Sequence, residues 1–161
     1  MASSPFLTFN FRVSIRVADG DEIGAAEFSE CDGLELTIEP KTIREGGNNF
    51  QPIHLMGPVS YGQLSLKRGM SEDASIWDWM EETIAAGGYG RRAEARVELL
   101  STDRTEGEGD DNLPPPVTAF RLTGCLPTKV KCPSLSAKDG GIAIEELQIA
   151  YETLRRLPEG E

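Results

Sequence analysis

The sequence has 161 residues, which suffices for one domain with a hydrophobic core and is short for two. Hydrophobic residues make up 39% and charged residues 27%, as in ordinary soluble globular proteins, and this balance argues against a disordered chain. The net charge of −11 disfavours a face that binds nucleic-acid phosphates or anionic membranes.

Targeting signals and reactive cysteines are not expected. No stretch approaches the roughly 20 apolar residues that span a bilayer, and the N-terminus lacks the pattern of a secretory signal. Cys31, Cys125 and Cys132 are odd in number and widely spaced, which favours reduced, buried thiols in a protein made in the cytosol. With one histidine in the chain, they do not fit a zinc site.

The N-terminal quarter reads as strands. Over 9–17, apolar residues alternate with Asn10, Arg12, Ser14 and Arg16, which predicts a strand with one buried and one polar face. A weaker strand follows over 25–31, and Asp32-Gly33 predicts a tight turn. The next strand runs from residue 34 to Pro40, where its end should be a sheet edge or leave the sheet, because proline cannot donate to a ladder.

One helix is predicted after a strand over 60–69, in which Gly62 marks a β-bulge. Ser71 is its expected N-cap and Gly87-Gly88 its end. The expected apolar face, with Trp77 beside it, consists of Ile76, Met80, Thr83 and Ile84.

The second half again alternates. A strand is predicted over 93–99, with Glu94, Arg96 and Glu98 on its polar face. Residues 102–116 form an acidic, Pro-rich surface loop, and closing strands are expected over 117–125 and 140–154. The apolar pattern changes phase at Glu145-Glu146, which predicts a β-bulge in one long strand; a helix over 144–157 is the alternative.

These elements amount to about seven strands and one helix without a βαβ rhythm. The predicted fold is mainly β, an antiparallel β-barrel or sandwich with one flanking α-helix, in a single domain over 1–161. No enzymatic site is expected, because His54 is the sole histidine and the carboxylate pairs are adjacent residues that diverge on helices and strands. No cofactor, metal or catalytic residue is predicted.

Four segments, in order, carry a family resemblance. They are the N-terminal F-x-V-x-I strand with "ECDGLEL", then "IREGGNN" and a Gly-Pro step, then "LSLKRG" with "IWDW", and finally "GCLPTKVKCPSLSAKDGGIAIEELQIAYETL". Together they resemble the contractile phage tail tube proteins, which include the inner tube proteins of phage-tail-like contractile injection systems. The loop over 103–116 is longer and more acidic than the family pattern, and residues 18–26 are less similar.

The resemblance implies a structural conduit. Six subunits would join their sheets into a ring around a channel, and rings would stack into a tube inside a sheath. Implied partners are the chain itself, a sheath protein, baseplate or hub and terminator proteins, and effector protein or DNA in the lumen, with no membrane anchor. The chain would be made in the bacterial cytoplasm and assembled into a phage tail, tailocin or injection particle. The alternative is a secreted, ring-forming effector carrier of the type VI secretion kind.

Two sets of residues are then candidates for assembly. The polar strand faces, which mix both signs of charge, would line the lumen or a seam between subunits, with an ordinary solvent-facing sheet as the alternative. A negative lumen would suit sliding DNA, and protein effectors are equally possible cargo. The residues of these faces are Arg12, Ser14, Arg16, Glu94, Arg96 and Glu98. Residues 42–58 would project to the next ring instead of folding over their own core. Their expected inter-ring contacts are Arg44, Glu45, Gly46, Gly47, Asn48, Asn49, Phe50, Ile53, Leu55 and Met56.

Overall fold

The computed structural model describes residues 10–24, 28–47, 50–87, 90–101, 116–138 and 140–158. Within these ranges the chain forms ten strands and one helix, which confirms the mainly β, antiparallel fold. The elements are β1 (Phe11–Val17), β2 (Glu22–Ile23), β3 (Glu30–Asp32), β4 (Leu36–Ile43), β5 (Ile53–Tyr61), β6 (Gln63–Gly69), α1 (Ser75–Ala85), β7 (Ala93–Leu100), β8 (Pro116–Lys131), β9 (Ile144–Ala150) and β10 (Thr153–Leu157). The predicted loop over 102–116 lies outside the described residues, except for Pro116.

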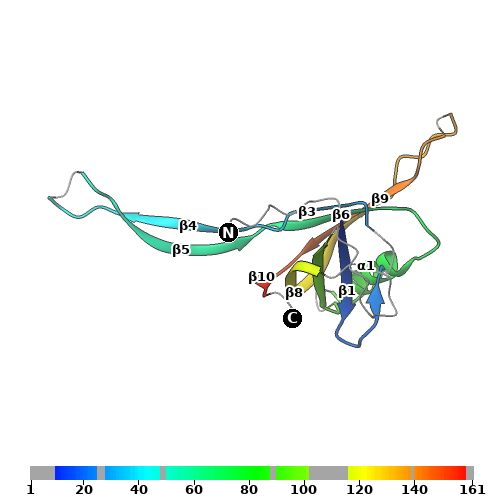
Figure 1. The fold of residues 1–161 in the computed structure, drawn as a ribbon, viewed down its shortest axis with the longest axis horizontal. Coiled ribbons are helices and arrows are strands. Elements are labelled where there is room, and N and C mark those ends of the chain that lie inside the picture. Colours follow the sequence, from blue (N-terminus) through cyan, green and yellow to red (C-terminus); the bar gives the residue numbers. More distant parts are fainter. Residues whose placement is uncertain are drawn as a thin grey trace.

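Eight strands form one antiparallel sheet in the order β2-β1-β7-β8-β9-β6-β3, and β10 also pairs with β8. The long strand β8 joins the two halves, because its first part pairs with β7 and its last part with β9. Its register with β7 shifts between Ala93 and Ala95, beside Gly124, whose φ of 65° suits a local bend. The two halves enclose the core beside α1, and the separate β4–β5 ribbon extends away from this body (Figure 1).

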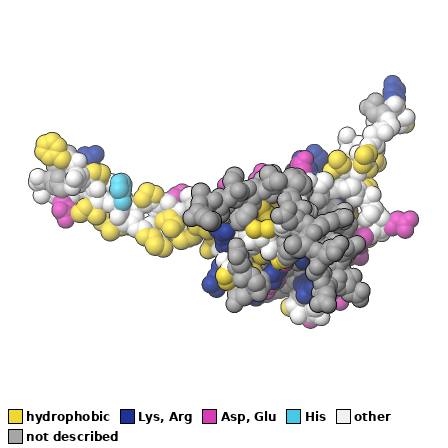
Figure 2. Space-filling view, in the orientation of Figure 1, with side chains coloured by type: hydrophobic (Ala, Val, Ile, Leu, Met, Phe, Trp, Pro, Cys, Tyr) yellow, Lys and Arg dark blue, Asp and Glu magenta, His cyan; other side chains and the backbone are white. Residues whose placement is uncertain are grey.

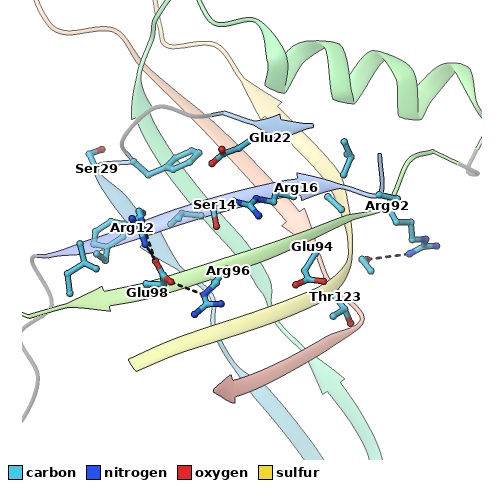
Figure 3. Close-up of a pocket in the computed structure, with 18 of the residues that line it drawn as sticks. Arg12, Ser14, Arg16, Glu22, Ser29, Arg92, Glu94, Arg96, Glu98 and Thr123 are labelled. Carbon is cyan, nitrogen blue, oxygen red and sulfur yellow. Dashed lines mark hydrogen bonds and ion pairs between the residues drawn. The ribbon is translucent and has the colours of Figure 1, made fainter. Parts of the chain in front are cut away.

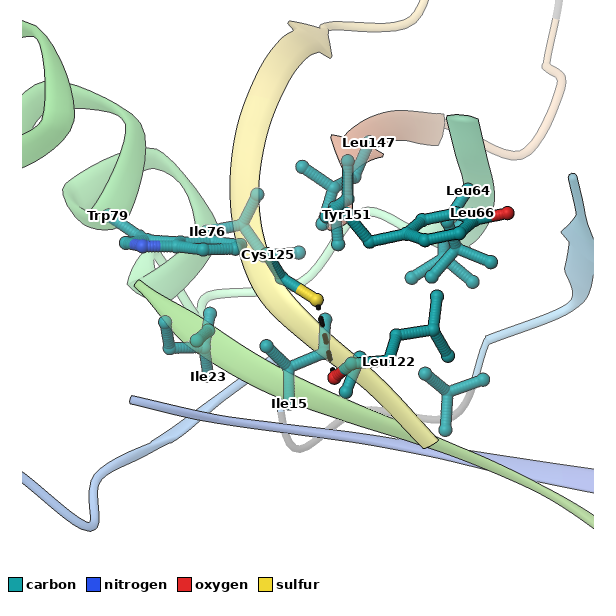
Figure 4. Packing of buried hydrophobic residues seen from close by; sticks show 14 of the residues in the cluster. Ile15, Ile23, Leu64, Leu66, Ile76, Trp79, Leu122, Cys125, Leu147 and Tyr151 are labelled. Atoms are coloured by element: carbon teal, nitrogen blue, oxygen red, sulfur yellow. Dashed lines mark hydrogen bonds between the residues drawn. The ribbon is translucent and has the colours of Figure 1, made fainter. Parts of the chain in front are cut away.

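The core joins both halves of the sheet to one face of α1 (Figure 4). Trp79 is 1% exposed, and its Nε1 donates to the carbonyl of Arg91 at 2.9 Å. The predicted helix face is right for Ile76, which is buried, and wrong for Ile84, which is 71% exposed. The helix face that packs on the core runs through residues 76, 79 and 83. Ile84 comes one residue after this face, so the rotation of the helix directs its side chain away from the core.

The helix begins three residues later than predicted. Its N-cap is Ala74 rather than Ser71, and it makes no side-chain capping bond. The Asp73 carboxylate accepts a hydrogen bond from the Ser75 backbone N–H at 3.0 Å, while Arg68 donates to the Asp73 carbonyl at 2.9 Å. Residues 71–74 are therefore held as a connection to β6, and the helix can start only after them.

Two strand boundaries also differ from the predictions. Strand β4 continues through Pro40 to Ile43, because it pairs only with β5 and its register shifts between Ile38 and Pro40. Gly62 separates β5 from β6 instead of forming a bulge within one strand.

The C-terminal prediction of one long, bulged strand is wrong, and so is the helical alternative. Strand β9 pairs with β6 in unbroken register, and β10 is a separate strand that pairs with β8. The apparent change of phase arises because Glu145 occupies a buried position in line with Leu147 and Ile149, whereas Ile144 is exposed.

Candidate assembly surfaces

The β4–β5 hairpin is a free-standing ribbon with an apolar surface. Figure 2 shows hydrophobic side chains along its length. Met56 is 74% and Phe50 94% exposed, and the other exposed large hydrophobic residues of this segment are Leu36, Ile38, Ile43, Ile53, Leu55 and Val59. A two-stranded ribbon is marginally stable alone, and an apolar surface of this extent marks a binding surface.

The predicted inter-ring residues lie on this hairpin. Ile53, Leu55 and Met56 belong to β5, and the other described members lie toward the tip; Asn48 and Asn49 fall outside the described residues. Every described member is exposed: Arg44, Glu45, Gly46, Gly47, Phe50, Ile53, Leu55 and Met56. The segment therefore does not fold over its own core.

Both faces of the hairpin carry apolar side chains. Leu55 and Met56 are neighbours on β5 and lie opposite Lys41 and Pro40 with no register shift between them. Because side chains alternate along a strand, these two exposed residues point to opposite faces of the ribbon. An assembly that covers this apolar area must therefore contact both faces.

The base of the hairpin is fixed to the body by Tyr151, which is 6% exposed. Its hydroxyl donates to the Gly33 carbonyl at 2.7 Å and accepts from the Glu35 backbone N–H at 3.2 Å. Its ring lies 5.8 Å from that of Tyr61. Burial raises the pKa of this phenol, so it stays protonated and can donate.

A second projection, which the sequence analysis missed, leaves the body at the opposite end. Residues 132–138 and 140–143 lie between β8 and β9 and belong to the orange extension in Figure 1. Their Leu135 is 81% and Ile142 87% exposed. The one indication of this projection in the sequence is that the residues between β8 and β9 do not alternate between apolar and polar. The subunit thus presents apolar surfaces at both ends.

The six residues predicted for the lumen or a seam lie together on one face of β1 and β7 (Figure 3). In register, Arg12 is opposite Glu98, Ser14 opposite Arg96, and Arg16 opposite Glu94. Directly opposed residues share a face of the sheet. A groove of about 1380 Å³ runs along this face.

Ion pairs organise this face. Glu98 accepts from Arg12 Nε at 2.8 Å and lies 2.8 Å from Arg96 Nε, so its side chain is only 8% exposed. Arg121 Nε of β8 lies 2.7 Å from Glu94 Oε1. Sequence reasoning missed Arg121, although the alternation of Arg121 with Leu122 within β8 was a usable signal.

A buried network connects two of the four segments that carry the family resemblance, the third and the fourth. Arg68 of "LSLKRG" forms an ion pair with Glu145 of "AIEEL", and Trp77 of "IWDW" donates to Glu145 Oε2 at 3.1 Å. Arg68 Nη1 also lies 3.2 Å from Asp73, whose pKa is lowered by its hydrogen bonds from Ser75 and then by Arg68. The network ties the helix to β6 and β9.

Within the described residues, no group of three or more His, Cys, Asp or Glu side chains could hold a metal ion, and no helix is long and apolar enough to cross a membrane. Burial raises the pKa of both the Cys31 and the Cys125 thiol to about 11. The prediction of buried thiols is right for Cys125 and wrong for Cys132, which is exposed at the end of β8.

The fold of this chain is similar to that of several solved structures. A chain in the cryo-EM structure of the anti-feeding prophage (AFP) baseplate, 6-fold symmetrised, aligns with a TM-score of 0.78 and 24% identity over 97% of each chain. A chain of an extracellular contractile injection system, the PVC sheath-tube complex in its extended state, aligns with a TM-score of 0.73 and 17% identity over 95% and 91% of the two chains. A crystal structure of Hcp protein aligns at 0.54 with 12% identity over 89% and 90%.

These likenesses establish the fold. No curated protein sequence matches significantly. The model of the T4-like virus tail tube protein gp19 family matches residues 7–155, nearly the whole sequence. The chain therefore belongs to the T4-like virus tail tube protein family.

Proposed function

We propose that this tail tube protein is the structural subunit of the inner tube of a contractile phage tail or contractile injection system. The observation that carries this proposal is the β4–β5 hairpin, a ribbon that is anchored at its base and whose large apolar side chains are exposed. Burying its apolar side chains against other copies would supply free energy at about 25 cal/mol per Å². Its role is structural rather than catalytic.

The two apolar projections suit head-to-tail assembly. Surfaces at opposite ends of a subunit form heterologous contacts, which close into rings or continue as filaments. The hairpin of one subunit would dock on copies in the adjacent ring, and exposed strand edges would join the sheets of six subunits. The six-fold symmetry of the AFP baseplate structure supports a hexameric ring.

The polar face of β1 and β7 would line the channel. Its ion-paired arginines and glutamates tolerate water, and its groove is concave. A sheath would surround the tube, as supported by the similarity to a chain in a sheath-tube complex, while baseplate or hub and terminator proteins would cap it. The subunit would be made in the bacterial cytoplasm and carry effector protein or DNA through the lumen of the particle.

Electron microscopy of purified protein tests this proposal. The native sequence should form stacked rings, whereas the double variant Ile53→Ser and Leu55→Ser should remain folded by circular dichroism and fail to stack. A matched control, Thr37→Ser and Ser60→Thr, changes a polar pair of the same hairpin. The type VI-like alternative predicts isolated rings, and a strictly monomeric native protein would contradict both proposals.

A further inference from the structure

An unusual row of arginines crosses three adjacent strands. Arg96 of β7 lies opposite Arg121 of β8, and Arg121 lies opposite Arg155 of β10. Directly opposed side chains on one face approach each other closely, and like charges in these positions are destabilising. Glu94 and Glu98 offset part of this repulsion on the β7 side. Arg155 makes no hydrogen bond or ion pair with the described residues.

The described strands of this face carry a net positive charge, although the chain is acidic. Opposed pairs across β2, β1, β7, β8 and β10 give five arginines and three glutamates, a net charge of +2: Arg12, Arg16, Arg96, Arg121, Arg155, Glu22, Glu94 and Glu98. The chain as a whole carries −11. The described strands of this face therefore do not present the negative surface that would suit sliding DNA.

We propose that this face binds acidic protein cargo. The inference rests on the proposed function, which places the face in the channel. A ring of six subunits would then present a net charge of +12 from these residues, within a confined space that concentrates the field. Of the five arginines on this face, Arg16 and Arg155 are exposed and have no partner among the described residues, so they can contact carboxylates of the cargo.

The mixture of arginine and glutamate on this face favours an acidic protein over nucleic acid as the cargo. Arg16 lies in register between Glu22 on β2 and Glu94 on β7. Duplex DNA presents about one negative charge per 1.7 Å of its axis, and these carboxylates would repel such a continuous phosphate backbone. An acidic protein surface carries both signs with an excess of negative charge, and therefore complements a mosaic of arginine and glutamate.

The test uses assembled tubes and a fluorescent octaglutamate peptide as the probe. The test variant is Arg16→Gln with Arg155→Gln, which removes two charges of the face and breaks no contact among the described residues. The control is Lys129→Gln with Lys131→Gln, which removes two exposed charges near the far end of β8. Electron microscopy establishes that tubes are present, and fluorescence anisotropy measures peptide affinity at low and physiological salt.

The native tubes and the lysine variant should bind the peptide equally, and salt should weaken both. The arginine variant should bind about twofold to thirtyfold more weakly, which corresponds to losing two exposed ion pairs per site. Equal binding by native and arginine-variant tubes would overturn the cargo inference and leave the tube function standing. Tighter binding of an eight-nucleotide single-stranded DNA than of the peptide would also overturn it. Failure of the native protein to form tubes would overturn both.

Discussion

Arg68 and Glu145 form an ion pair in the interior of the protein, where their side chains are 1% and 4% exposed. The pair lies between β6 and β9 and is joined by Trp77 of the helix. A buried pair of this kind contributes little net stability relative to apolar packing, because desolvating the two charges is costly. Removing either side chain alone, however, would leave the other charge buried without its partner, which is strongly destabilising.

Replacing Glu145 by Gln should strongly destabilise the fold. The change leaves the Arg68 guanidinium buried with only the partly exposed Asp73 as an anionic partner, and breaking a buried ion pair costs about 3–5 kcal/mol. Urea unfolding measures this loss. The adjacent control Glu146→Gln affects a half-buried residue and should cost less than about 1 kcal/mol. Equal losses in the two variants would refute the role of the network.

Tyr151→Phe should loosen the base of the hairpin. The variant removes the acceptor for the Glu35 N–H and the donor to the Gly33 carbonyl, at a cost of about 1–3 kcal/mol. Hydrogen exchange at Glu35 should accelerate. Tyr61→Phe is the matched control, because the Tyr61 hydroxyl makes no hydrogen bond with the described residues. Comparable exchange in both variants would show that the hydroxyl does not anchor the hairpin.

Two glycine substitutions in the hairpin should distinguish an effect on folding from an effect on docking. A Cβ at Gly57 would lie 1.9 Å from the Glu39 carbonyl oxygen, so Gly57→Ala should distort the ribbon. A Cβ at Gly46 meets nothing within 4 Å, so Gly46→Val should leave the subunit's thermal stability unchanged and impair stacking. Gly47→Val is a less clean test, because φ is +95° there and a side chain is strained in any state. Normal tubes from Gly46→Val would argue against a docking role for the tip.

The three thiols should differ in reactivity at pH 8. With a pKa of about 11, Cys31 and Cys125 are almost entirely protonated, and burial also restricts access to Cys125. Exposed Cys132 should therefore react with iodoacetamide much faster than the other two. Mass spectrometry of tryptic peptides after a timed reaction identifies the labelled residue, and preferential labelling of Cys125 would contradict the described packing.

The sequence predicted well those features that depend on alternation within one strand. The period of two over 9–17 and 93–99 predicted a polar face on each strand, with Arg12, Ser14 and Arg16 on the first and Glu94, Arg96 and Glu98 on the second. The pairing of these two faces is visible only in the structure. The family resemblance, rather than the composition, supplied the expectation that residues 42–58 project.

What the sequence could not supply were contacts between distant segments. Glu145 looked like a break in a hydrophobic pattern because its partner, Arg68, lies 77 residues away. The same limit hid the start of α1, which depends on bonds from Arg68 and Ser75 to Asp73. It also hid the arginine row, because only the pairing of β10 with β8 brings Arg155 opposite Arg121.

Hydrogen exchange of the hairpin amides, compared between dispersed subunits and assembled tubes, tests the central claim most directly. Among the described strands, β4 and β5 pair with each other and with no third strand, so the amides of this ribbon should exchange fast in the subunit, and those at the tip fastest. In tubes, docking on neighbouring copies should slow exchange along residues 36–61. Equally fast exchange in subunits and tubes would contradict the assignment of the hairpin as the assembly element.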